Sequence, residues 1–363
     1  MGVRGPIEVH LDDLSSHPAV RAWSALHSGA EPESVEVWRE GKEGDRSRTS
    51  LYRLTFVPTE HPAVFAKAGS PSKLGVECLV YQDILPHLGL TMPAFHGLVE
   101  GEDGRVWLFV EDVGNEPLLV KDRGQRLLAS RWLGMMHRSA QDVEAVARLP
   151  DAGPARYLAH VRSAERRIQR NLGNPKLTRE ERAFLIEILH QLAHAEARWE
   201  RIEKACEGYP CTLVHGDFRP KNVRLRAGED GPALYPIDWE KAGWGIPAAD
   251  LAPARDSGPL VEPEVYVSTV RVRWPELDAQ GVLQMCVLGQ TFRALAAIDW
   301  ACAGLDVDSR LRLGSSLADL RSFKARLAAA ERAAAEWEGS RAPFMHLPGM
   351  VAGQPQGDNS RPA

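Results

Sequence analysis

The feature that most limits how this chain can fold is a short polar segment, residues 211–251, set between long helical patterns. An apolar run there leads into a His-Gly-Asp turn that ends at Asp217, and Asn222 follows five residues later. A second apolar run ends at Asp238, and Glu240 follows it after one tryptophan. Short apolar runs bounded by glycine, proline and polar residues are typical of buried strands. The pattern therefore predicts two strands that each deliver a carboxylate to a loop.

Two carboxylates and one amide in such positions suit phosphoryl transfer. That reaction needs a carboxylate to accept the proton of the attacking hydroxyl, and oxygen ligands to hold Mg²⁺ against the phosphates. Asn222 and Asp238 suffice as ligands, because Mg²⁺ takes one or two protein oxygens together with phosphates and waters. The competing interpretation is a surface turn in which Asp217 and Asn222 hydrogen-bond only to their own backbone, but the two apolar runs around them favour the reactive site.

Residues 34–113 carry the patterns of a small antiparallel sheet with one helix packed on it. Strand-like runs occupy 34–38, 51–57 and 63–67, helical spacing follows at 72–88, and two more strand-like runs surround the turn at 101–104. The second half of the chain is helical. Apolar residues recur there with a period of 3.6 over 121–139, 154–172, 178–207, 280–303 and 309–337.

These patterns predict an α+β chain with two lobes and a tail. The N-terminal lobe, 1–113, contains the sheet, its helix and a leading helical segment, and it is expected to bind a nucleotide. The C-terminal lobe, 114–345, is mostly helical and contains the polar segment, so it is expected to hold the catalytic and acceptor sites. Residues 346–363 are rich in proline, glycine and polar residues, which indicates a disordered tail.

The polar segment resembles the aminoglycoside phosphotransferase and choline kinase family, which is related to the protein kinases. Its first loop matches the pattern H-G-D-x-x-x-x-N, and Ile-Asp-Trp-Glu at 237–240 matches the family's I-D-x-E segment. Residues 239–252 continue the match to W-E-x-A-x-x-G-x-P-x-x-D-L-A. The likeness extends in order over most of residues 35–330. It implies a bilobal, protein-kinase-like fold with a small antiparallel sheet and helix followed by a larger, mostly helical lobe.

The resemblance assigns the reactive groups. Asp217 would be the catalytic base, and Asn222 and Asp238 would be the Mg²⁺ ligands. Arg219 stands where protein kinases have a lysine that contacts the transferring phosphate. A cation at this position would stabilise the negative charge that spreads over the equatorial oxygens in the transition state.

Three further residues of the same segment would support the site. By the resemblance, Glu240 would assist the metal, and His215 would brace the catalytic loop. Asp250 precedes an apolar residue, and we expect it to cap a helix or to brace that loop as well.

The nucleotide site would lie in the N-terminal lobe. Lys67, at the end of the third strand-like run, matches the family's phosphate-binding lysine, and Glu77 matches the carboxylate that holds it. The simpler interpretation of Lys67 is a solvated lysine on an edge strand. The run that ends at Glu111 and Val113 resembles the hinge whose backbone receives the base. The polar loop Gly41–Ser47 would cover the phosphates, although it lacks the G-x-G-x-x-G pattern of protein kinases.

Composition excludes several other classes of protein. The 363 residues carry a net charge of -5 and have a pI near 6.2, with no basic run, so nucleic-acid binding is not expected. No stretch approaches 18 uncharged apolar residues, so we expect no membrane span. The five cysteines show no C-x-x-C spacing, which favours a reducing, cytoplasmic location. A P-loop motif and a G-x-S-x-G motif are both missing from the sequence.

The sequence thus predicts a Mg²⁺-dependent small-molecule kinase, acting as a monomer or homodimer with ATP or GTP as the phosphoryl donor. The acceptor would be an aminoglycoside-like antibiotic, a sugar or an amino alcohol. The alternatives are a kinase of a primary metabolite such as choline or homoserine, and a kinase-shaped binding module without catalysis. Carboxylates only slightly outnumber cations over residues 238–341, which does not separate these acceptors. Possible acceptor-site carboxylates are Asp256, Glu262, Glu264, Asp299, Asp306 and Asp308.

Overall fold

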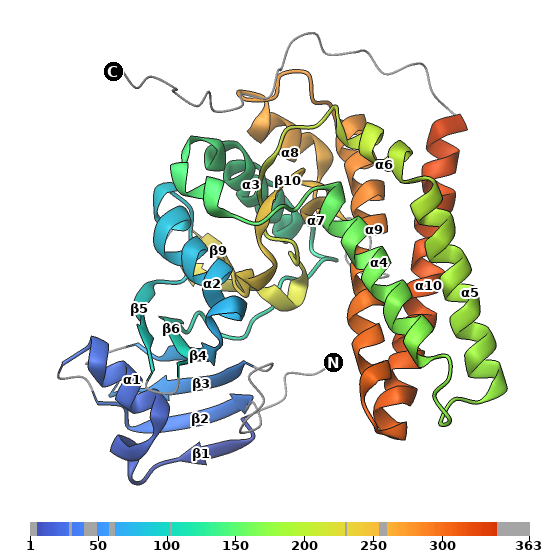
Figure 1. The fold of residues 1–363 in the computed structure, drawn as a ribbon. Coiled ribbons are helices and arrows are strands. Elements are labelled where there is room, and N and C mark those ends of the chain that lie inside the picture. Colours follow the sequence, from blue (N-terminus) through green and yellow to red (C-terminus); the bar gives the residue numbers. More distant parts are fainter. Residues whose placement is uncertain are drawn as a thin grey trace, which may run out of the picture.

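The computed structural model describes residues 6–28, 31–39, 49–57, 62–101, 104–228, 231–253 and 260–339. A sheet with two flanking helices forms one end of the molecule, and a bundle of long helices forms the other (Figure 1). The α+β architecture expected from the sequence, a small antiparallel sheet followed by a larger helical part, is confirmed. The expected phosphate-covering loop Gly41–Ser47, Asp256 and the expected tail 346–363 lie outside the described residues.

The sheet is antiparallel and has the strand order β1-β2-β3-β4-β6-β5. Its strands are β1 (Glu8–His10), β2 (Ser34–Arg39), β3 (Ser50–Thr55), β4 (Val64–Gly69), β5 (Phe95–Glu100) and β6 (Val106–Glu111). The sequence did not predict β1, because three residues with a single apolar side chain give no periodic signal. It forms by pairing with β2, where Val9 lies opposite Glu36.

The two faces of the sheet are covered by different helices, as the alternation of side chains along a strand requires. Trp107 and Phe109 pack with α1 (Pro18–Leu26), whose Trp23 is fully buried. Leu108, between them, packs on the opposite face with α2 (Pro71–Leu79). The predicted helix 72–88 is not continuous. A π-helical turn over Val80–Ile84 and a 3₁₀ turn over Leu85–His87 follow α2, and Pro86 has no N–H with which to extend an α-helix.

The helical part contains eight α-helices within the described residues. They are α3 (Arg123–Ser139), α4 (Pro154–Asn171), α5 (Arg179–Ala197), α6 (Trp199–Cys206), α7 (Ala248–Leu251), α8 (Pro263–Val270), α9 (Ala279–Cys302) and α10 (Arg310–Gly339). The predicted helix 178–207 is divided into α5 and α6 at Arg198, whose backbone leaves the helical region. The sequence did not predict α7 or α8, because both are too short to show a clear period.

The predicted β-rich segment forms two small antiparallel pairs. β7 (Thr212–Val214) pairs with β10 (Gly243–Gly245), and β8 (Val223–Gly228) pairs with β9 (Gly231–Pro236). The catalytic loop leaves β7, and Asp238 follows β9. Both predicted carboxylates therefore lie at strand ends between the sheet and the helical bundle.

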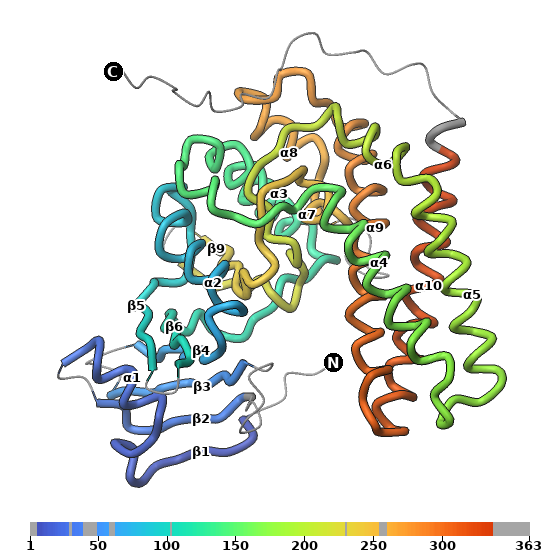
Figure 2. The backbone as a smooth tube through the Cα atoms, viewed as in Figure 1, coloured from blue at the N-terminus to red at the C-terminus, as the bar shows by residue number. Residues whose placement is uncertain are grey.

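α9 is the central helix of the bundle and packs against α4, α7 and α10 (Figure 2). Gly289 allows α7 to approach closely, because a Cβ at this position would lie 1.8 Å from the carbonyl oxygen of Ala248. Contrary to the expectation from the sequence, Ala279–Asp306 is long and apolar enough to cross a membrane by length and composition. More than half of its most apolar window, 56%, is buried inside the molecule, which is usual for a core helix.

Candidate active site

Lys67, Glu77 and Asp238 meet between the sheet and the helical part. Because side chains alternate along β4, Lys67 points to the face that α2 covers, between two alanines that face α1. Its Nζ lies 2.6 Å from Glu77 Oε2 and 2.8 Å from Asp238 Oδ1. Glu240 Oε2 is farther away, at 3.9 Å. The structure thus places Lys67 as a buried lysine held by carboxylates, not as a solvated edge residue.

Charge compensation determines the ionisation of this cluster. Burial alone would lower the pKa of Lys67, but the carboxylates of Glu77 and Asp238 reverse this effect and raise that pKa above its usual value. Burial would also raise the pKa of Asp238, yet the Lys67 ammonium holds it below its usual range. Burial raises the pKa of Glu77, while Lys67 opposes that rise. Lys67 and Asp238 are therefore both charged at neutral pH.

Asp238 has a left-handed backbone, with φ 69° and ψ 61°. Only Asp13 shares a positive φ among the non-glycine residues that the structure describes. Aspartate tolerates this region better than most residues, although the conformation still costs energy. It turns the chain sharply between β9 and the 3₁₀ turn Trp239–Lys241, so that the carboxylate points towards Lys67.

Asp217 is the centre of the catalytic loop and is only 8% exposed. Asn222 donates from Nδ2 to Asp217 Oδ2 at 2.9 Å and to its carbonyl oxygen at 3.0 Å. Arg219 forms an ion pair with the same carboxylate, and Lys221 Nζ lies 3.1 Å from its Oδ2. Burial would raise the pKa of Asp217, but the cations of Arg219 and Lys221 keep it below its usual value. The sequence did not single out Lys221, although a basic residue four positions after the expected base was a visible signal.

His215, Gly216 and Asp250 fix the backbone of this loop. Asp250 is fully buried and accepts hydrogen bonds from the N–H of His215 at 2.7 Å and from the N–H of Gly216 at 2.9 Å. His215 Nε2 lies 3.1 Å from the carbonyl oxygen of Ile237, which joins the two loops. Gly216 has φ +75°, and a Cβ there would lie 2.4 Å from the carbonyl oxygen of Lys241. Asp250 thus contacts the catalytic loop directly and does not accept a cap hydrogen bond in α7.

A buried chain of polar groups behind the loop was not predicted. His137 Nδ1, on α3, lies 2.8 Å from the hydroxyl of Tyr266, on α8, and His137 Nε2 lies 3.4 Å from Asp250 Oδ2. All three side chains are completely buried. Burial would raise the pKa of Asp250, but the hydrogen bond from His137 keeps it lowered. A single histidine in an apolar helix pattern gave no indication of these contacts.

The two expected hinge residues differ in the availability of their backbone groups. The N–H of Glu111 is bonded to the carbonyl oxygen of Ala94 at 2.9 Å, and the Glu111 carboxylate pairs with Arg226. Val113 has no backbone hydrogen bond within the part of the chain that the structure describes. The backbone groups of Val113 are therefore available to a base, whereas the N–H of Glu111 is not.

The oxygen atoms expected to bind Mg²⁺ have suitable chemistry. Asp238 offers a carboxylate and Asn222 an amide oxygen, since only the nitrogen of Asn222 is used towards Asp217. Glu240 lies beside them, near Lys67 and Lys241. Hard oxygen donors of this kind fit Mg²⁺, which completes its octahedral shell with phosphates and waters.

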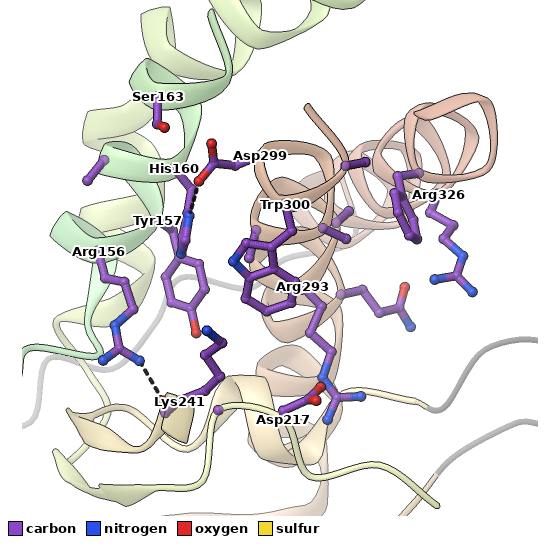
Figure 3. A pocket seen from close by; sticks show the side chains of 18 of the residues that line it. Arg156, Tyr157, His160, Ser163, Asp217, Lys241, Arg293, Asp299, Trp300 and Arg326 are labelled. Atoms are coloured by element: carbon purple, nitrogen blue, oxygen red, sulfur yellow. Dashed lines mark hydrogen bonds and ion pairs between the residues drawn. The ribbon is translucent and has the colours of Figure 1, made fainter. Parts of the chain in front are cut away.

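A cavity of about 1710 Å³ is lined at one end by Asp217 (Figure 3). The loop that carries Asp217, the turn at Glu240 and Lys241, and Asp151 line this end, and α4, α9 and α10 supply most of the other lining side chains. Of the six acceptor-site carboxylates considered from the sequence, Asp299 alone lines the cavity among those that the structure describes. Glu262 instead pairs with Arg126, Asp306 with Arg167, and Asp308 with Lys176.

Comparisons with known proteins place this geometry in a family. A sequence model of the phosphotransferase enzyme family (APH) matches residues 77–278, which is more than half of the chain. No curated protein sequence matches the chain. The structure resembles spectinomycin phosphotransferase APH(9)-Ia, solved with ADP and spectinomycin, with a TM-score of 0.55 and 13% identity over 85% of this chain and 97% of that one.

Two other solved structures are similar. Choline kinase from Cryptosporidium parvum Iowa II gives a TM-score of 0.53 and 12% identity, over 84% of this chain and 93% of that one. APH(2″)-IIIa, solved with GDP and kanamycin, gives a TM-score of 0.55 and 15% identity, over 84% of this chain and 97% of that one. At such low identity these likenesses show the fold, which is that of kinases acting on hydroxyl groups. With the family model covering more than half of the sequence, the chain belongs to the phosphotransferase enzyme family.

Proposed function

We propose that this protein is a Mg²⁺-dependent kinase that transfers the γ-phosphate of ATP or GTP to a hydroxyl group of a small acceptor. The observation that carries the proposal is the contact between Lys67 and Asp238, which joins the lysine of the sheet to the metal-binding carboxylate of the helical part. Nucleotide-bound relatives support a nucleotide donor, since similar structures were solved with ADP and with GDP.

Each group then has a defined task. Lys67, aimed by Glu77, would hold the nucleotide phosphates. The oxygens of Asn222 and Asp238 would hold Mg²⁺, which would supply positive charge to offset that of the phosphates. The available backbone groups of Val113 receive the base. With the donor held in this way, the γ-phosphate would lie near Asp217, at the end of the cavity that would hold the acceptor.

Asp217 accepts the proton of the acceptor hydroxyl as its oxygen forms a bond to the γ-phosphorus. The bond from that phosphorus to the bridging oxygen breaks, and the electron pair stays on the nucleoside diphosphate. Because its pKa is lowered, Asp217 is ionised and ready to accept a proton at neutral pH. Arg219 and Lys221 lie beside the carboxylate and can neutralise the charge of the transferring group.

The test is a coupled assay of nucleoside diphosphate release with Mg²⁺ and ATP or GTP. The acceptor panel contains aminoglycosides, macrolides, choline, homoserine and simple sugars, and mass spectrometry checks for one added phosphoryl group. We expect acceptor-dependent turnover that disappears when EDTA removes Mg²⁺ and when Asp217 is replaced by Asn. A folded protein that binds nucleotide yet phosphorylates no acceptor would support the non-catalytic module instead.

A further inference from the structure

The carboxylates of the acceptor cavity are almost all engaged within the protein. Those that line it are Asp151, Asp217, Glu240, Asp299 and Asp319. Asp151 caps α4, since it accepts the N–H groups of Gly153 and Arg156. Glu240 lies between the ammonium groups of Lys67 and Lys241. A positively charged acceptor would therefore have to compete with two lysines for Glu240 and with two backbone N–H groups for Asp151.

Asp299 shows the same pattern at the far end of the cavity from Asp217 (Figure 3). Its Oδ2 lies 2.8 Å from His160 Nδ1, and its Oδ1 lies 3.9 Å from Arg167 Nε. The side chain is only 12% exposed. Asp151 and Asp319, both exposed, are the lining carboxylates without an ion pair in the described part of the chain.

Two lining guanidinium groups, in contrast, have no carboxylate partner among the described residues. Arg156 donates to the carbonyl oxygens of Lys241, at 2.8 Å, and Ala242, at 3.2 Å. Arg293 donates to the carbonyl oxygens of Phe218, at 2.6 Å, and Ala252, at 3.1 Å. Carbonyl groups satisfy the donors but do not cancel the charge, and an arginine stays protonated in a protein. Asp250 and Asp217 still act electrostatically on Arg293. At the end of the cavity near Asp217, the lining cations Arg156, Arg219, Lys241 and Arg293 outnumber the lining carboxylates Asp151, Asp217 and Glu240 by one.

The aromatic side chain of Trp300, which lines the cavity, already contacts a cation of the protein. Lys241 Nζ lies over the ring of Trp300, 5.3 Å from its centroid. A quaternary ammonium group binds best on an aromatic face. Here such a ligand would meet the lysine ammonium on that face, which opposes the binding of choline-like acceptors.

Size and polarity limit the acceptor further. The volume of about 1710 Å³ exceeds the roughly 300–1,000 Å³ of a typical ligand pocket. Much of the lining is apolar, and it includes Leu283, Val287, Ala297, Trp300 and Phe323. Leu283 and Trp300 are 44% and 39% exposed, which leaves a large apolar contact surface open. A small amino alcohol would leave most of this surface in contact with water.

We propose that the acceptor is a bulky, largely apolar polyol with at most one positive charge, and that Trp300 is a specificity-determining contact for it. The inference rests on the proposed function, because it takes this cavity to be the acceptor site. On this inference, neither a polycationic aminoglycoside nor a small quaternary ammonium alcohol is the preferred acceptor. Its basis is the combination of engaged carboxylates, two lining arginines that form no ion pair among the described residues, and an exposed apolar wall.

Binding is measured apart from catalysis. Isothermal titration calorimetry with the full chain, Mg²⁺ and a non-hydrolysable ATP analogue compares three probes: erythromycin as a bulky polyol with one amine, kanamycin as a polycation, and choline. We expect the dissociation constant of erythromycin to be at least about tenfold lower than those of the other two. Trp300→Ala should raise it by about tenfold, whereas Ile186→Ala, an exposed apolar residue of α5 outside the cavity, should leave it unchanged.

Tighter binding of kanamycin or choline, or no measurable binding of erythromycin, would overturn the inference. So would equal effects of Trp300→Ala and Ile186→Ala. Steady-state kinetics with ATP and erythromycin then add an independent measurement, in which Trp300→Ala should raise KM while kcat changes little. The expected order of affinities without any turnover would support the acceptor class and contradict the proposed catalytic function.

Discussion

Lys67 and Asp238 are 171 residues apart in the sequence, yet Lys67 Nζ and Asp238 Oδ1 lie 2.8 Å apart in the structure. The contact links β4 of the sheet to the loop after β9. It also places an ammonium beside a carboxylate that is expected to bind Mg²⁺. Nucleotide phosphates and a metal ion would therefore bind where both charges already face each other, so that little rearrangement of charge is needed.

The first prediction concerns the pair formed by Lys67 and Glu77. Lys67→Ala should lower kcat/KM for the nucleotide, and Glu77→Ala should lower it less, because Asp238 still holds the lysine. The double variant should resemble Lys67→Ala, with a coupling energy of at least about 1 kcal/mol. A double-mutant cycle measures this, with Lys73→Ala, an exposed lysine of α2, as the control. Simple additivity would mean that Glu77 does not act through Lys67.

The second prediction concerns the base. Asp217→Asn should lower kcat by at least about 10²-fold with little change in nucleotide affinity, whereas Asp308→Asn, whose side chain is 92% exposed, should have no effect. Because the pKa of Asp217 is lowered, the carboxylate stays ionised as the pH falls to about 4. The pH profile of kcat/KM should therefore show no acid limb from this group above about pH 5. Near wild-type turnover in a folded Asp217→Asn variant would exclude its role as the base.

The third prediction concerns the metal. Asp238→Ala removes the carboxylate ligand and should raise the Mg²⁺ concentration needed for half-maximal rate by at least about tenfold. Asn222→Ala should raise it less, because water replaces a neutral ligand more easily than a charged one. Asn222→Ala should also lower kcat, since Asn222 donates two hydrogen bonds to Asp217. A magnesium titration compares the variants, and a larger shift for Asn222→Ala would reverse the ranking of the ligands.

The main elements of the fold could be predicted because their signals are local. Five of the six strands of the main sheet and the long helices follow from hydrophobic period, while β1, α7 and α8 are too short to show one. The loop that carries Asp217 and Asn222 could be singled out because the spacing of its motif is fixed, and the structure brings the two side chains into contact. The pairing of Lys67 with Glu77 was expected from the resemblance, and the structure places the two in contact.

The remaining features depend on which elements pack together. His137 and Tyr266 come from α3 and α8, and no period or motif links them before the chain folds. The charge of the acceptor cavity could not be derived from composition either. Carboxylates and cations are nearly balanced over residues 238–341. The small excess of cations near Asp217 arises only when the chain folds and brings Arg156, Arg219, Lys241 and Arg293 to one end of the cavity.

The last prediction concerns the buried chain from Tyr266 through His137 to Asp250. Asp250→Ala would leave the N–H groups of His215 and Gly216 without their acceptor, so the free energy of unfolding should fall by about 3 kcal/mol. Tyr266→Phe is the milder variant. It removes one hydrogen bond to His137 and should cost about 1 kcal/mol, which keeps the comparison possible if Asp250→Ala does not fold.

The pH dependence of this stability separates a charged brace from simple packing. The hydrogen bond from His137 overcomes the effect of burial and lowers the pKa of Asp250 in the folded state. A carboxyl group with a lowered pKa stabilises the fold above its unfolded pKa of about 3.9, and this contribution is lost as the pH falls through the folded value. Urea unfolding of the wild type and of Asp250→Ala should therefore give a constant difference between pH 6 and 8, approximately, and a smaller one below about pH 4. A difference that grows on acidification would contradict an ionised Asp250, and the loop would then depend on packing alone.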